Sequence, residues 1–153
     1  MGHVNITDIE DGVSIALDTV VLVYFLERHI RHFSIIKKLF HRIEKGQVRG
    51  LMSSLVYTEL LIPAYRAGRS DLAMQTFNYL SRFPNLTTTS VSPPISREAA
   101  RLRATYGLRT PDAIHAATAL HQKADLILTN DKHFSRIHTE MPIAFLDESS
   151  SFK

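Results

Sequence analysis

The stretch that decides the fold is residues 13–28, VSIALDTVVLVYFLER. Residues 13–17 form an apolar run of strand length, and Asp18 and Thr19 then lead directly into an apolar segment of helical length. Similar apolar runs recur along the chain, separated by segments whose apolar residues have helical spacing. Because alternating strands and helices form parallel sheets, the pattern predicts a three-layer α/β/α fold around a mostly parallel sheet of about four to five strands.

Turn and capping residues set the expected boundaries of these elements. The expected strands are residues 13–17, 48–52, 86–91, 126–128 and 143–146. The expected helices are residues 18–28, 31–45, 54–67, 70–82, 92–106 and 110–122, with a short helical turn at 131–136. No repeat, low-complexity tract or linker interrupts the chain, so we expect residues 1–148 to form a single domain and residues 149–153 a flexible tail.

Composition limits the classes of protein and of site. The chain has 153 residues and no cysteine, so a metal would need oxygen or imidazole ligands. No apolar stretch approaches the roughly 20 residues that span a bilayer, and no secretory signal opens the chain, which predicts a cytoplasmic protein without a membrane segment. Lys and Arg number 18 against 15 Asp and Glu, a balance that favours a polyanionic partner.

Four acidic residues lie just past the expected strands, or one helical turn further on. They are Asp18, Glu59, Asp112 and Asp131. In an open parallel sheet the carboxyl ends of the strands meet at one edge, so these carboxylates can converge there. A converged set of carboxylates predicts a site for a divalent metal ion.

Each acid also has a purely structural explanation. Asp18 can cap the first helix, Asp112 can interact with the dipole of its own helix, and Asp131 can form a turn. Glu59 lies in the nearly apolar segment LVYTELLIPAY, where a buried carboxylate needs a cation. That cation is either a metal ion or Arg66, which lies on the same helical face.

Four segments resemble those of a known family in their order and approximate spacing. They read IALDTVVLVYFLE, LMSSLVYTELL, LRTPDAIHAATAL and ADLILTNDKHF. The chain resembles the PIN domain family of metal-dependent nucleases, and within it the VapC-type toxins of bacterial and archaeal toxin-antitoxin pairs. The resemblance spans almost the whole chain, and its most specific part is the last segment, where Thr129, Asn130, Asp131 and Phe134 match the family's arrangement.

The resemblance implies a PIN-like fold and a function. The acidic residues Asp18, Glu59, Asp112 and Asp131 would be catalytic ligands of Mg²⁺ or Mn²⁺, with Thr129 and Asn130 supporting them. The activity implied is that of a metal-dependent endoribonuclease that hydrolyses RNA phosphodiesters and acts as the toxin of a toxin-antitoxin pair. Such a toxin would bind a small antitoxin protein.

A homodimer is a further implication of the resemblance. Val23, Phe25 and Leu26 of the first helix are candidate contacts between the two copies, and burial in the core is the alternative explanation for them.

Basic residues and histidines are the candidates for substrate contacts. Possible contacts are Arg97, Arg101, Arg109 and His133, and for each arginine cluster the alternative is a solvated helix face. His133 occupies a position where some relatives have a carboxylate, so it either alters a second metal position or is an exposed loop histidine. We interpret His115, one turn after Asp112, as a packed or surface histidine rather than a ligand.

Three other functions compete with the nuclease. A catalytically silent PIN-like module would bind RNA or a protein, and the retained acids argue against it. A haloacid-dehalogenase-type phosphatase needs a second Asp two residues after Asp18, where this chain has Val20. A receiver-like domain would have an acidic pair after the first strand and a Lys after the last, and neither is evident.

Overall fold

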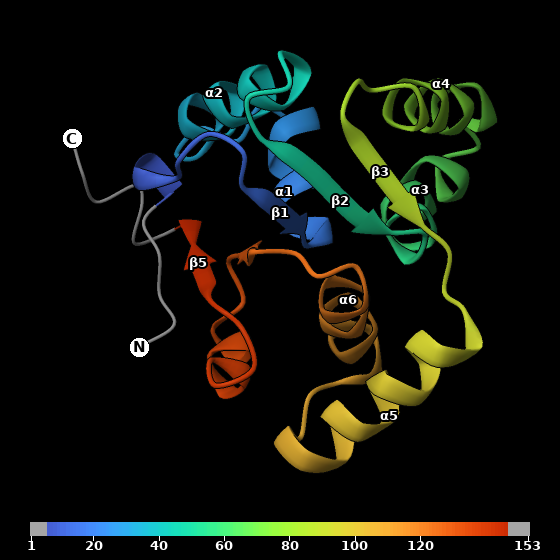
Figure 1. The fold of residues 1–153 in the computed structure, drawn as a ribbon. Coiled ribbons are helices and arrows are strands. Elements are labelled where there is room, and N and C mark those ends of the chain that lie inside the picture. The colour runs from blue at the N-terminus through green and yellow to red at the C-terminus, as the bar shows by residue number, and fades with distance from the viewer. Residues whose placement is uncertain (1–5, 147–153) are drawn as a thin grey trace.

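The central sheet has five strands, all parallel (Figure 1). The structure is a computed structural model that describes residues 6–146, so the tail predicted at 149–153 lies outside the described residues. The strands are β1 (Ser14–Leu17), β2 (Arg49–Ser53), β3 (Leu86–Thr89), β4 (Leu126–Thr129) and β5 (Ile143–Phe145). They are arranged in the order β3-β2-β1-β4-β5, which confirms the predicted parallel α/β/α architecture.

Helices connect successive strands. The α-helices are α1 (Thr19–Leu26), α2 (Phe33–Glu44), α3 (Leu55–Arg66), α4 (Ser70–Ser81), α5 (Pro93–Tyr106) and α6 (Thr110–His121). Short 3₁₀-helices are η2 (Lys132–Ile137), where a helical turn was predicted, and η1 (Ile6–Asp8), which was not. Helix α1 ends before the predicted residue 28 because Arg28 has a φ of 52°, outside the helical region. Among residues 6–146, no helix combines the length and apolar character of a transmembrane segment.

Both faces of the sheet are covered, which makes two cores. Ile15 and Leu17 of β1 pack in one core and Ala16 packs in the other, because successive side chains of a strand point to opposite faces. Residues of α1, α2, α3 and α4 contribute to the first core, and those of α5, α6 and η2 to the second. Figure 1 shows these two helical layers above and below the strands. Double coverage explains why β1, β4 and β5 are buried at every position, whereas the edge strand β3, with the sequence LTTT, is only partly buried.

The strand order places a crevice beside β1. Strand β1 lies between β2 and β4, and the chain reaches these neighbours by connections on opposite faces of the sheet. Such a switch point opens beyond the carboxyl ends of the strands. The register pairs Leu17 with Leu128, and the Asp18 amide donates a hydrogen bond to the Leu128 carbonyl at 3.1 Å. The first of the four acids, Asp18, is therefore fixed at the end of β4.

Gly50 is a packing constraint in β2. A Cβ atom at this position would lie 2.9 Å from Cδ1 of Leu86 and 3.2 Å from Cδ1 of Ile43. We expect Gly50→Ala to lower the free energy of unfolding by about 1–3 kcal/mol, the usual cost of overpacking, in urea denaturation. Leu86→Val added to Gly50→Ala should recover part of the loss. If the double variant lost more free energy of unfolding than the two single variants lose together, this explanation would be contradicted.

Candidate functional site

A cavity of about 280 Å³ opens at the carboxyl ends of β1 and β4. All four predicted acids line it: Asp18 follows β1, Glu59 lies in α3, Asp112 lies in α6 and Asp131 follows β4. The other lining residues are Thr19, Val20, Tyr24, Arg109 and Asn130. The fold therefore brings together the carboxylates that are dispersed along the sequence.

Asp18 is a buried carboxylate and also a helix cap. Its Oδ1 accepts a hydrogen bond from the Thr19 amide at 2.8 Å, and its Oδ2 accepts one from the Thr129 hydroxyl at 2.8 Å. Burial raises the pKa of Asp18, and the nearby His115 and the Thr129 hydroxyl oppose that increase. The predicted N-cap is confirmed, and both carboxylate oxygens have donors at the edge of the cavity.

The loop after β4 is held by its own side chains. The Thr129 hydroxyl oxygen accepts a hydrogen bond from the Asp131 amide at 3.0 Å, while Nδ2 of Asn130 donates to the Tyr24 hydroxyl at 3.4 Å. Oδ1 of Asp131 accepts the His133 amide at 2.9 Å and lies 2.8 Å from Nδ1 of the His133 ring. His133 is exposed, as predicted, but it contacts a carboxylate of the site rather than solvent alone.

Glu59 reaches the cavity from α3. Its Oε1 accepts a hydrogen bond from the Thr19 hydroxyl at 2.7 Å and lies 2.7 Å from Nε2 of His115. The His115 hydrogen bond is the largest of the effects that lower the pKa of Glu59. Arg66, the alternative partner expected from the sequence, forms no ion pair with Glu59 within the described part of the chain.

Asp112 is paired with Arg109, three residues before it. Nε of Arg109 lies 3.0 Å from Oδ2 of Asp112, and Nη2 lies 3.5 Å from Oδ1. The same Nη2 is 3.8 Å from Oδ2 of Asp131, so the guanidinium spans two of the acids. The Asp112 side chain is 8% exposed and that of Arg109 is 72% exposed. The carboxylate is fixed at the first turn of α6, while its cation is at the surface of the cavity.

These contacts determine how the carboxylates are oriented. Within residues 6–146, no three acidic or histidine side chains are arranged as a ready set of metal ligands. Arg109 and His115 instead neutralise or hydrogen-bond them. The donor set is nonetheless made of carboxylate oxygens in one cavity, which is the chemistry that Mg²⁺ and Mn²⁺ favour.

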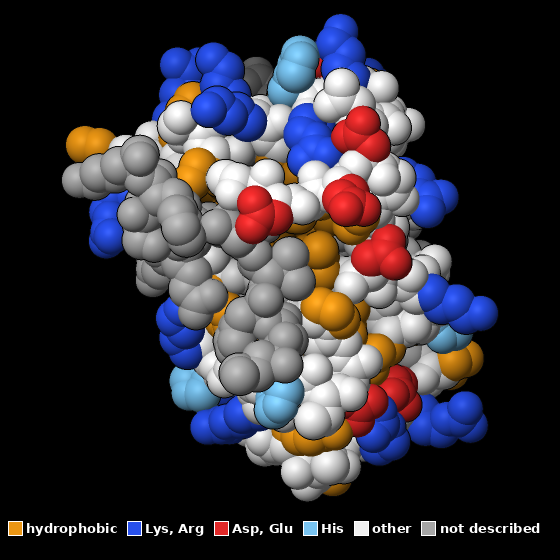
Figure 2. Space-filling model, turned by 60° about the vertical axis from the view of Figure 1, so that its left-hand side comes forward, with side chains coloured by type: hydrophobic (Ala, Val, Ile, Leu, Met, Phe, Trp, Pro, Cys, Tyr) orange, Lys and Arg blue, Asp and Glu red, His pale blue; other side chains and the backbone are white. Residues whose placement is uncertain are grey.

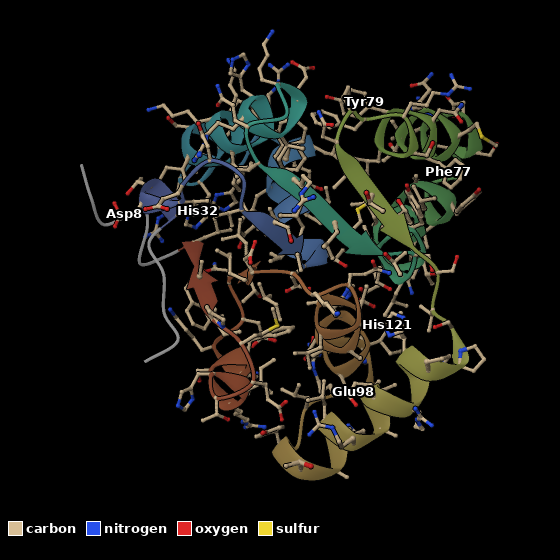
Figure 3. The ribbon with its side chains drawn as sticks, viewed as in Figure 1. Asp8, His32, Phe77, Tyr79, Glu98 and His121 are labelled. Carbon is tan, nitrogen blue, oxygen red and sulfur yellow. The ribbon has the colours of Figure 1, made fainter. Side chains whose placement is uncertain are left out.

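Two of the predicted substrate contacts lie elsewhere. Arg101 on α5 is bound by Glu98 at 2.6 Å and by Glu140 at 3.0 Å, and Figure 3 shows Glu98 on the lower helical layer. Arg97 is exposed on the same helix, and neither arginine lines the cavity. Among the three arginines singled out, only Arg109 does so, because it immediately precedes the helix that carries Asp112.

Besides Val20, which lines the cavity, three residues of the site were not predicted to have a role in it. Thr19 and His115 bind the Glu59 carboxylate, and Tyr24 lines the cavity. His115 is buried, so the expectation of a packed histidine is correct, but it packs against the site. The available signal was spacing: His115 follows Asp112 by three residues, which places both on one face of α6.

In metal-free buffer, the neutral variants Asp18→Asn and Glu59→Gln should change the free energy of unfolding in opposite directions as pH rises. Because the pKa of Asp18 is raised above its ordinary value of 3.8, ionisation of this group lowers the stability of the fold as pH rises above 3.8. Asp18→Asn, which cannot ionise, should therefore become more stable relative to wild type as pH rises. The charged form of Glu59 stabilises the fold, fully above pH 4.5 and less as pH falls below it. Glu59→Gln should therefore be less stable than wild type above pH 4.5.

Urea denaturation of the three proteins across a pH series measures this difference. The two variants serve as controls for each other, since each removes one charge from the same cavity. Stability differences that change in the same direction with pH would contradict the opposite pKa shifts.

Comparison with known proteins identifies the fold family. The family model described as PIN domain matches residues 15–139, whereas no curated protein matches the chain. Among solved structures, DNA-bound VapBC from Salmonella typhimurium has a TM-score of 0.69 at 17% identity, covering 88% of this chain and 98% of that one. VapBC2 from Rickettsia felis, bound to a promoter DNA fragment, has a TM-score of 0.66 at 19% identity, covering 86% and 96%.

The third similar structure is that of a toxin. VapC20 from Mycobacterium tuberculosis, which cleaves the sarcin-ricin loop, has a TM-score of 0.63 at 14% identity, covering 80% of this chain and 92% of that one. Identities this low show a common fold, and the family match extends across the segments that carry all four acids. The chain belongs to the PIN domain family.

Proposed function

We propose that this protein is a metal-dependent endoribonuclease and the toxin of a toxin-antitoxin pair. The observation that carries the proposal is the convergence of Asp18, Glu59, Asp112 and Asp131 on one cavity. Nothing in the packing of the two cores requires four like charges at one place, and their mutual repulsion is unfavourable without a cation. Membership of the PIN family and the fold shared with VapC20 support hydrolysis of RNA.

Mg²⁺ or Mn²⁺ would be held by oxygens of these four carboxylates. When bound, the metal would lower the pKa of a water molecule and polarise the phosphodiester. Thr129 holds Asp18 in place for this role, and its buried hydroxyl also accepts the Asp131 amide, so one side chain orients two of the acids. Carboxylate oxygens that hydrogen bonds hold in place can bind a metal ion without rearrangement of the loop.

Arg109 is the candidate contact for substrate phosphate. Its guanidinium lies at the cavity, and its largely exposed side chain can turn from Asp112 and Asp131 toward a phosphate oxygen. Because Asp112 is buried, this exchange requires a metal ion to take over the neutralisation of its carboxylate. Lys and Arg side chains gather along the upper edge of the face in Figure 2, and Lys37 and Lys38 are exposed on α2. Such basic side chains can contact the backbone of a longer RNA.

The competing functions have less support. A silent binding module would have no need of the hydrogen bonds that orient Asp18 and Glu59 into the same cavity. The phosphatase alternative needs a carboxylate at position 20, and Val20 lines the cavity there. A receiver domain would require a second acid beside Asp18, where Thr19 binds Glu59 instead.

Wild-type protein should cleave structured RNA in the presence of Mg²⁺ or Mn²⁺, and chelation should abolish cleavage. Asp18→Asn and Asp112→Asn should each lower the cleavage rate by a factor on the order of 100 or more, because each removes a charged metal ligand. Gel analysis of a labelled RNA hairpin measures the rate, and a DNA hairpin of the same sequence tests the preference for RNA.

Arg97→Met is the matched control, because Arg97 is exposed on α5 and does not line the cavity. It should cleave at the wild-type rate. Cleavage that persists undiminished in both aspartate variants, or in excess chelator, would disprove the proposed catalytic site.

A groove beside the cavity suits the antitoxin. It has a volume of about 480 Å³, lies between α1, α3 and α4, and is lined mostly by apolar side chains that include Leu60, Pro63 and Leu72. Glu59 lines both this groove and the acidic cavity, so a segment bound here would reach the site. The solved neighbours include a toxin-antitoxin complex from Klebsiella pneumoniae, which supports an antitoxin as the occupant.

Leu72→Asp should prevent co-purification with the product of the neighbouring gene, the expected antitoxin, because it places a charge in an apolar groove. Met74→Asp is the control: Met74 is exposed on the same helix and does not line the groove. Equal capture of the partner by both variants in a tagged pull-down would show that the groove is not the binding site.

Homodimer formation and a cytoplasmic location stay predictions. The expected contact residues of α1 have other roles in this structure. Phe25 stacks on Phe40 with ring centroids 3.9 Å apart, and Val23 and Leu26 line the groove. Apolar side chains are exposed on α4 instead, including Phe77 and Tyr79, which Figure 3 shows on the upper right layer.

A further inference from the structure

We infer that His115 is a positioning residue that fixes the Glu59 carboxylate, so that one oxygen is held by the protein and the other is left for a cation. The inference rests on the proposed function, because it concerns how Glu59 serves the metal. It assigns a role to a histidine outside the acidic set.

The geometry that carries this inference joins two helices. His115 lies on α6, one turn after Asp112, and Glu59 lies on α3. Nε2 of His115 is 2.7 Å from Oε1 of Glu59, 3.3 Å from the Thr19 hydroxyl and 3.9 Å from Oδ1 of Asp18. The His115 side chain is 5% exposed and that of Glu59 is 34% exposed. The imidazole is therefore the buried support and the carboxylate is the exposed end of the pair.

The surroundings of the imidazole determine which nitrogen carries the hydrogen. Nδ1 is buried and has no hydrogen-bond partner among the described residues. A hydrogen on Nδ1 would be buried without an acceptor, which is costly, whereas a hydrogen on Nε2 points at an anionic oxygen. We therefore assign the tautomer with the hydrogen on Nε2, which makes His115 a donor to Glu59.

Both donors to Glu59 act on the same oxygen. The Thr19 hydroxyl and the His115 ring each bind Oε1, at 2.7 Å. Two hydrogen bonds to one oxygen fix the rotation of the carboxylate plane and its place in the cavity. Oε2 is then the oxygen available to the cation, with the orientation set before binding. Without His115, the carboxylate would rotate about a single remaining bond to Thr19.

His115 is better suited to this role than to metal ligation. Its only donor or ligand atom near the cavity is Nε2, which is committed to Glu59, and Nδ1 is buried. Mg²⁺ prefers oxygen ligands, and the four carboxylates already supply them. Hydrogen bonds from such supporting residues commonly change metal affinity by about 10- to 100-fold.

The experiment measures Mn²⁺ affinity by calorimetry on the full chain, with His115→Leu, His115→Gln and His121→Leu. Leu fills the buried space without a donor, and the side-chain amide of Gln replaces the Nε2 hydrogen. His121 is exposed at the end of the same helix, as Figure 3 shows, and serves as the matched control. Electron spin echo of Mn²⁺ in the wild type reports any directly bound imidazole nitrogen.

We expect His115→Leu to weaken Mn²⁺ binding by about tenfold or more, His115→Gln to recover most of that loss, and His121→Leu to bind like wild type. The spin echo should show no directly coordinated nitrogen. Unchanged affinity in His115→Leu, no recovery in His115→Gln, or a bound-imidazole signal would each overturn the inference. Failure of the wild type itself to bind Mn²⁺ would instead refute the metal site of the proposed function, and this inference with it.

If His115→Leu does not fold, Thr19→Val provides the same test from the other donor. It removes the second hydrogen bond to Oε1 and leaves α6 unchanged. Weaker Mn²⁺ binding in Thr19→Val, together with the absence of a nitrogen signal in wild type, would support fixation of Oε1. Wild-type affinity in this variant would overturn it.

Discussion

Repulsion among carboxylates gathered at one edge of the sheet is the constraint on which the rest of the site depends. Four acids line a single cavity, and two of them are buried: Asp18 at the end of the central strand and Asp112 in the first turn of α6. Charges so placed must find donors or cations, since neither desolvation nor mutual repulsion is tolerated without compensation. Each carboxylate accordingly has at least one partner, Arg109 is shared by Asp112 and Asp131, and the partners come from different elements of the fold.

The partners divide the site into a rigid and an adaptable half. Asp18 and Glu59 are held by buried or half-buried groups, of which Thr129 and His115 are the most enclosed. Asp112 and Asp131 face Arg109, whose exposed guanidinium can move. One half can keep its geometry while the other exchanges a side-chain cation for a metal and a phosphate. This division follows from which helix or strand supplies each donor.

Structural and chemical roles coincide in the same residues. Asp18 caps α1 while it lines the cavity, and Asp131 caps η2 through the His133 amide. A cap needs only one carboxylate oxygen, so the second oxygen can serve another purpose. For this reason the structural explanation of each acid, taken alone, neither supports nor excludes a place in the site.

Much of the fold could be read from the sequence because local chemistry determines it. The apolar runs, helix caps and terminating glycines predicted each described strand and α-helix to within two residues, because these signals act between near neighbours in the chain. The crowding of the acids at one edge could also be foreseen, since all parallel strands end on the same side. The short helix at Ile6–Asp8 has no comparable signal and was missed.

Only the tertiary structure decided which side chains meet. The sequence suggested Arg66 for Glu59 from helical spacing, but α3 turns that carboxylate toward Thr19 and His115, which come from α1 and α6. The sequence also suggested both Arg101 and Arg109 as substrate contacts, but Glu98 and Glu140 hold Arg101 outside the cavity. Contacts between residues far apart in sequence depend on strand order and helix packing. The sequence by itself therefore determined the elements and the acidic set, and packing between helices determined how each acid is oriented.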